Sequence, residues 1–202
     1  MFVLPEQVRL DHQRISRDFQ TLVRSASADR LDQPTRGTRW TNRQLLWHMA
    51  FGQHITRVLL PVMGGFSRLP PGASRRFATF LTAMTRPYDA VNYAGSAAGA
   101  RVTGLGLARR WMRHDTAWLL TWGASAPDPQ LAAGMSVPQT WDPFFTPWMS
   151  RLDVLVWAPK HYEHHRAQLT LGGTAAQCPP ARAAPNPTAG RADTDPRQPH
   201  TR

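Results

Sequence analysis

The chain has 202 residues, of which 42% are hydrophobic, so it can form one domain with a sizeable core but not two full-sized domains. Its formal net charge of +11 comes from scattered residues, 23 of the 24 basic ones being arginines, which favours a solvated basic surface over a specific nucleic-acid site. The chain has a single cysteine, Cys178, which excludes a disulfide framework. It has no uninterrupted apolar run long enough to span a membrane, which argues against a membrane protein. Its start lacks signal-peptide features, so we expect a cytoplasmic protein.

The first predicted helix covers residues 6–25. Its apolar residues recur at helical spacing and form one face, made of Val8, Ile15, Phe19 and Leu22. His12 falls on the same face, so its side chain is expected to point inward. It is either a hydrogen-bonded core residue or a partner that orients a metal-binding histidine.

A second helix is expected to begin after Thr41 and to be ended by Pro61 and Gly64–Gly65. Thr41 and Gln44 have the spacing of a capping box, in which each side chain binds a backbone N–H at the start of the helix. The inward face of this helix includes His48. His54 lies six residues later and is expected to point elsewhere.

The connection over residues 64–100 has no long periodic segment, and we expect only a short amphipathic helix between Pro71 and Pro87. A connection of this length can return the chain along a bundle, so the flanking helices need not be antiparallel. A third long helix is expected over residues 105–122. Asp115 lies on its apolar face and either accepts a hydrogen bond from a metal-bound histidine or sits at the polar margin of the helix.

Aromatic residues, including Trp141 and Phe145, precede the last predicted helix and either wall a pocket or plug one end of the core. We expect this helix to be capped by Thr146, with Pro147 at its first position, and to end at Gly172–Gly173. The segment 174–202 has almost no large apolar residues, which predicts a disordered tail. The expected organisation is therefore a helical domain over residues 1–173 and a tail over 174–202.

Three of the eight histidines fall within residues 161–165. On a helix, His161 and His165 lie one turn apart on the same face, where two imidazoles can bind one metal ion. The alternative is a solvated, polar end to the last helix. Imidazole suits zinc and nickel among other metals, and a catalytic zinc site usually has three protein ligands, so a third ligand is needed.

Two motifs resemble those of the DinB-like (DNA-damage-inducible) superfamily of four-helix-bundle proteins. The family patterns are W-[ST]-x-x-x-L-x-x-H on the second helix and H-x-x-H-H-x-x-Q-L on the fourth. In this chain they read Trp40-Thr41 to His48, and His161 to Leu169. The resemblance covers roughly residues 6–172. It implies an all-α four-helix bundle with a long crossover between helices 2 and 3 and an up-down-down-up arrangement.

The resemblance also implies a site and a chemistry. Its metal ligands map to His48, His161 and His165, with zinc or nickel as the expected divalent ion, and Gln168 is a further candidate contact. Characterised relatives include S-transferases and isomerases that bring a low-molecular-weight thiol, such as mycothiol, bacillithiol or glutathione, to the metal. We therefore expect a metal-dependent, thiol-dependent transferase that acts on a small molecule in detoxification or stress response.

Two other functions stay open at this point. Within the same class, a metal-bound water could hydrolyse a substrate. In a different class, the domain would be a non-enzymatic, metal-stabilised helical module for partner proteins or, given its charge, for nucleic acid. A homodimer is also left open.

Overall fold

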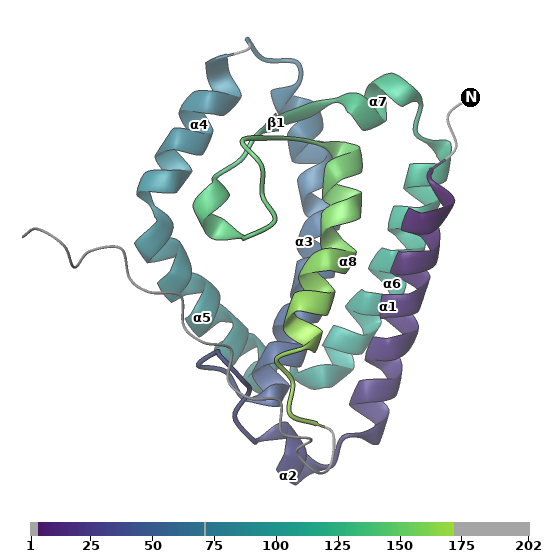
Figure 1. Ribbon diagram of the computed structural model, residues 1–202, viewed down its shortest axis with the longest axis vertical. Coiled ribbons are helices and arrows are strands. Elements are labelled where there is room, and N and C mark those ends of the chain that lie inside the picture. Colours follow the sequence, from purple (N-terminus) through teal and green to yellow (C-terminus); the bar gives the residue numbers. More distant parts are fainter. Residues whose placement is uncertain (1–3, 71, 172–202) are drawn as a thin grey trace, which may run out of the picture.

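Four long helices follow the apolar faces found in the sequence: α1 (Glu6–Ser25), α3 (Asn42–Phe66), α6 (Gly104–Ser125) and α8 (Arg151–Arg166). The computed structural model describes residues 4–70 and 72–171 (Figure 1). Its other elements are α2 (Ala28–Leu31), α4 (Gly72–Ala83), α5 (Thr85–Val102), α7 (Asp128–Ala132), β1 (Gly134–Ser136), the 3-10 turn η1 (Gln139–Trp141) and β2 (Trp148–Ser150). The predicted all-α fold is confirmed, and the expected tail and its boundary at residue 173 lie outside the described residues.

The long helices have the predicted up-down-down-up arrangement. α3 and α6 run parallel, since Trp47 bonds to Thr103 near their beginnings and Gln53 bonds to Thr116 further along both. Figure 1 shows α1 and α8 running in the opposite direction to this pair, with α4 and α5 returning the chain to the end from which α6 begins. In the part of the chain that the structure describes, no helix is long and apolar enough to cross a membrane.

The crossover contains more helix than the sequence predicted. α4 and α5 together extend from Gly72 to Val102, whereas only a short helix had been expected before Pro87. α5 escaped detection because its buried positions are Ser96 and Ala100, which give no apolar stripe. The small residue Gly99 faces the indole ring of Trp47 on α3, so the two helices pack closely there.

The last helix begins later than predicted. Ser150, not Thr146, is its N-cap, and it forms a capping box with Asp153. Residues 148–150 instead pair with residues 134–136 as an antiparallel ribbon, in which Gly134 lies opposite Ser150. The ribbon requires glycine at position 134, because a Cβ there would be 2.2 Å from the carbonyl oxygen of Met149. α8 also ends at Arg166, before the predicted Gly172.

His12 compensates for a proline in α8. Pro159 has no N–H, so the carbonyl of Leu155, one turn earlier, lacks its usual helical donor. The Nε2 of fully buried His12 donates to this carbonyl at 2.9 Å, and Gln53 donates to His12 Nδ1 at 3.0 Å. Of the two roles predicted for His12, the structure therefore supports the hydrogen-bonded core residue, which holds α8 just before its histidine motif.

Candidate metal centre

Three histidines from two helices converge where the first part of α3 faces the last turns of α8. His48 comes from α3, and His161 and His165 come from successive turns of α8. Each of them offers one ligand nitrogen, and these nitrogens all lie within 4.8 Å of one another. The side chains are buried, with 6%, 8% and 9% of the residue surface exposed, respectively. The cluster could therefore hold a metal ion away from bulk water.

A different neighbour fixes the Nδ1 atom of each histidine. Ser96 lies 3.1 Å from Nδ1 of His48, Asp142 lies 2.7 Å from that of His161, and Gln168 lies 2.7 Å from that of His165. The carboxylate of Asp142 and the amide oxygen of Gln168 each accept a hydrogen bond from the Nδ1–H of their histidine, which leaves the Nε2 atoms of His161 and His165 with a free lone pair. For His161 and His165 the tautomers are therefore those that metal binding through Nε2 requires.

The absence of a side chain at Gly52 makes room for the cluster. A Cβ at this position of α3 would lie 3.0 Å from Cδ2 and 3.2 Å from Nε2 of His161, which is tighter than ordinary packing. The Nε2 edge of His161 therefore faces α3, while its Nδ1 edge faces Asp142. Glycine at this position allows the α8 imidazoles to approach His48 closely.

Burial keeps two of the imidazoles neutral. It lowers the pKa of His48 well below 6.5, and the neighbouring His161 and His165 lower it further. Burial also lowers the pKa of His165 to about 3. Burial opposes ionisation of Asp142, but its hydrogen bonds with His161 and the Phe144 N–H hold the pKa of this carboxyl below its usual value. Neutral imidazoles beside one carboxylate are in the protonation state that binds a cation.

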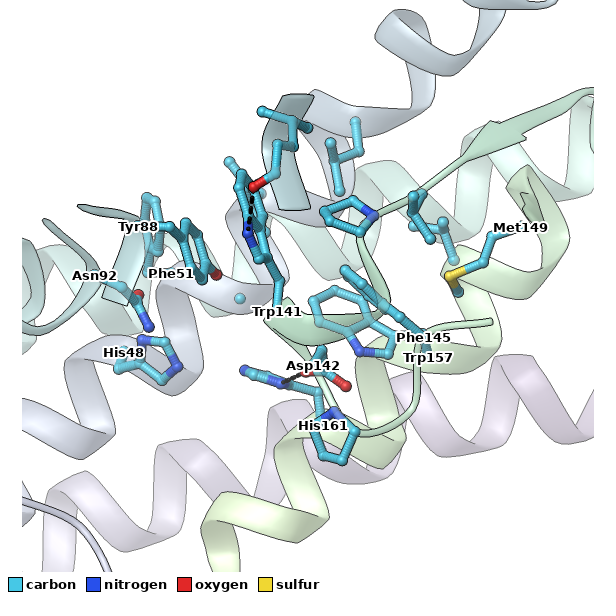
Figure 2. Close-up of a pocket in the computed structure, with 18 of the residues that line it drawn as sticks. His48, Phe51, Tyr88, Asn92, Trp141, Asp142, Phe145, Met149, Trp157 and His161 are labelled. Carbon is cyan, nitrogen blue, oxygen red and sulfur yellow. Dashed lines mark hydrogen bonds and ion pairs between the residues drawn. The ribbon is translucent and has the colours of Figure 1, made fainter. Parts of the chain in front are cut away.

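A cavity of about 490 Å³ opens beside the three histidines (Figure 2). Trp141 and Phe145 line it, so of the two roles predicted for the aromatic segment the structure supports the pocket wall. Trp141 stacks against Tyr88 of α5, with ring centroids 3.8 Å apart and the planes inclined by 4°. His164 is exposed but also lines this cavity, with its ring edge-on to His165.

Asp115 lies outside this site. It is 1% exposed and accepts hydrogen bonds from His54 at 2.9 Å and Arg57 at 2.8 Å. It therefore neither orients a histidine of the cluster nor lies at a polar margin, the two alternatives that the sequence suggested. Its burial is balanced by these two partners on α3, which the apolar periodicity of α6 could not reveal.

Sequence reasoning missed Asp142 and the polar face of α5. Asp142 lies between Trp141 and Pro143 in a segment without helical periodicity, so nothing in the local pattern separates it from a loop acid. Ser96, Asn92 and Tyr88 are spaced four residues apart on α5 and so share one helix face. This polar stripe at helical spacing was the sequence signal that could have revealed α5 and its inward face.

Acidification is expected to destabilise the metal-free protein. The folded-state pKa values of His12, His48 and His165 lie below the unfolded value near 6.5, so below that pH the unfolded chain binds protons that the folded chain does not. Each histidine then contributes a loss of up to about 1.4 kcal/mol per pH unit. Urea titrations at pH 7.5 and 5.5 measure this, and an unchanged free energy of unfolding would show that these imidazoles are not held neutral.

The fold and the cluster together define a four-helix-bundle protein with a buried three-histidine site that could bind a metal ion. The family model of the DinB superfamily matches residues 10–169, a span that includes all three histidines, and the chain belongs to this superfamily. The resemblance seen in the two sequence motifs is thereby confirmed. No curated protein and no solved structure matches the chain significantly.

Proposed function

We propose that this protein is a divalent-metal-dependent enzyme whose zinc or nickel ion is held by His48, His161 and His165. One observation carries the proposal: three buried histidines converge while the Nδ1 atom of each has its own hydrogen-bonding neighbour. Such outer partners are typical of metal-binding histidines, because they fix the ring and its tautomer. Histidines that merely fill a core have no need to converge in this way with a separate partner at each Nδ1.

The donor set fits a catalytic rather than a closed structural ion. Structural zinc sites are usually closed by four protein ligands, whereas catalytic sites have three and keep a position open. The described residues supply three histidines to this cluster, and the cavity lies next to them. An ion bound there would supply Lewis-acid chemistry and favour the ionised form of a bound thiol or water.

The surrounding residues have separate tasks in this proposal. Asp142 keeps the proton of His161 on Nδ1 and compensates part of the positive charge of the ion. The walls around Trp141 and Phe145 exclude water from the open side and hold the second reactant. A volume of about 490 Å³ lies within the range of small-molecule sites, which is roughly 300–1,000 Å³.

For the reaction, we propose transfer of a low-molecular-weight thiol, such as mycothiol or glutathione, to a small-molecule substrate. The cavity beside the open position supports this, since it provides space for a second molecule next to a bound thiolate. We also propose that the protein acts in the cytoplasm, where such thiols remain reduced. The runner-up is hydrolysis by a metal-bound water at the same position.

The test uses full-length protein purified without a histidine tag. Metal analysis should find about one divalent ion per chain, and titration of the cobalt-substituted protein with thiol should produce a sulfur-to-cobalt charge-transfer band. A full complement of metal without such a band would favour hydrolysis. Absence of a stoichiometric metal ion would reject the enzyme proposal, and unfolding on mild chelation would instead indicate a structural ion.

A further inference from the structure

The lining of the cavity differs in charge from the rest of the protein, which is strongly basic. The chain contains 23 arginines, yet among residues 4–70 and 72–171 no arginine or lysine lines this cavity. Asp142 is the one carboxylate that the described residues place in its wall, and it is already bonded to His161. Burial raises the pKa of Tyr88 to about 12, so this phenol is neutral as well. An anionic ligand entering the cavity would therefore lose hydration without gaining a cationic side chain.

The walls favour a flat, apolar ligand. The rings of Tyr88 and Trp141 stack almost in parallel, and on another wall Phe145 and Trp157 pack with centroids 5.3 Å apart. Aliphatic side chains of α3 and α4 complete the lining. Aromatic faces of this kind pack well against planar apolar molecules.

In the part of the chain that the structure describes, Asn92 is the one amide side chain in this lining. It lies one turn before Ser96 on α5, about 6 Å along the helix axis, and Ser96 contacts His48. Figure 2 shows Asn92 near His48 in the pocket wall. Among residues 4–70 and 72–171, no hydrogen bond engages its side-chain amide, so the N–H groups are available to a ligand.

We infer that the cavity binds a neutral, planar and largely apolar molecule that carries one carbonyl-type acceptor, which the amide of Asn92 holds near the three histidines. A few placed polar groups in an apolar pocket fix ligand orientation, and Asn92 has that position. The inference names the substrate class of the proposed enzyme, and it rests on that proposal only in treating the bound molecule as a substrate. Binding itself depends on the cavity alone.

The binding test uses metal-free, full-length protein and three fluorescent naphthalenes. The first is prodan, a neutral dimethylaminonaphthalene ketone; the second has a carboxylate in place of the ketone, and the third has neither group. At physiological salt, one prodan molecule should bind per chain. Its affinity should be at least tenfold higher than that of the carboxylate. The protein charge of +11 favours the opposite order, so tighter binding of the carboxylate would overturn the inference.

Two pairs of variants locate the binding. Leu81→Trp on α4 fills the cavity and should lower the affinity for prodan at least tenfold. Thr79→Trp, on the exposed side of the same helix, should leave this affinity unchanged. Asn92→Leu should lower the affinity for prodan severalfold and shift the prodan emission to the blue, because the ketone loses its hydrogen-bond donor. The affinity for the third naphthalene, which has no ketone, should not change. Ala94→Leu on the exposed face of α5 is the matched control.

The outcomes separate this inference from the metal proposal. Prodan binding that is unchanged in both Leu81→Trp and Asn92→Leu would reject the inference, provided that circular dichroism shows both variants folded. Protein stripped of its metal by a chelator should still bind prodan. Selective prodan binding by a protein that takes up no metal would preserve the inference and reject only the enzyme proposal.

Discussion

Replacing His48 with alanine should abolish stoichiometric metal binding as completely as replacing His161 or His165. Each residue provides one of three ligand nitrogens within 4.8 Å, and two remaining imidazoles leave half of a four-coordinate site to solvent. We expect at least a 100-fold loss of affinity for zinc, a larger effect than loss of an outer hydrogen-bonding partner. Competition with a chromophoric chelator measures it directly.

The matched controls are two histidines that lie close to the cluster in sequence. His54 hydrogen-bonds to Asp115 instead, and His164 is exposed at the cavity. The His54→Ala and His164→Ala variants should therefore still bind one metal ion per chain. Loss of metal in the His54 variant, or retention in the variant lacking all three cluster histidines, would contradict the site. Measuring every variant in untagged protein prevents an engineered tag from supplying ligands.

Asp142 provides a graded test of the same site. Asp142→Ala removes the acceptor that holds the Nδ1 proton of His161, without touching the three ligand nitrogens. Metal affinity should then fall by about 10- to 100-fold, which is typical for loss of an outer partner. A loss equal to that of His161→Ala would instead make the carboxylate itself a ligand.

The bundle helices were predictable because capping residues and apolar faces, both local features of the sequence, determine where they form. Thr41 and Gln44 set the start of α3 by capping, and a buried apolar face then runs through Leu45 and places His48 inward. His161 and His165 must share a face of any helix that contains them. That the two faces meet followed from the family resemblance rather than from periodicity.

The crossover and the last loop were not predictable in the same way. α5 faces a cavity and the cluster, so its inward residues, Asn92 and Ser96, are polar, and no hydrophobic pattern indicates the helix. Asp142 approaches His161 only because the ribbon of residues 134–136 and 148–150 folds its loop over α8. Both contacts depend on tertiary structure, which local sequence does not encode.

The packing of α5 against α3 predicts opposite effects of two identical substitutions one turn apart. A Cβ at Gly99 would lie 2.2 Å from the indole ring of Trp47, whereas a Cβ at Gly95 has no neighbour within 4 Å. Gly99→Ala should therefore lower the free energy of unfolding by about 1–3 kcal/mol, the usual range for overpacking. Gly95→Ala should raise it by up to about 1 kcal/mol, because alanine favours the helix.

Urea denaturation of the two variants, compared with the parent protein, measures both effects. The Gly99 variant should also bind metal more weakly, because displacing α5 moves Ser96 away from Nδ1 of His48, which it now approaches to 3.1 Å. The Gly95 variant should bind metal as the parent does. Equal stabilisation by both substitutions would mean that α5 does not pack on Trp47, and the placement of Asn92 and Ser96 beside the histidines would then be wrong as well.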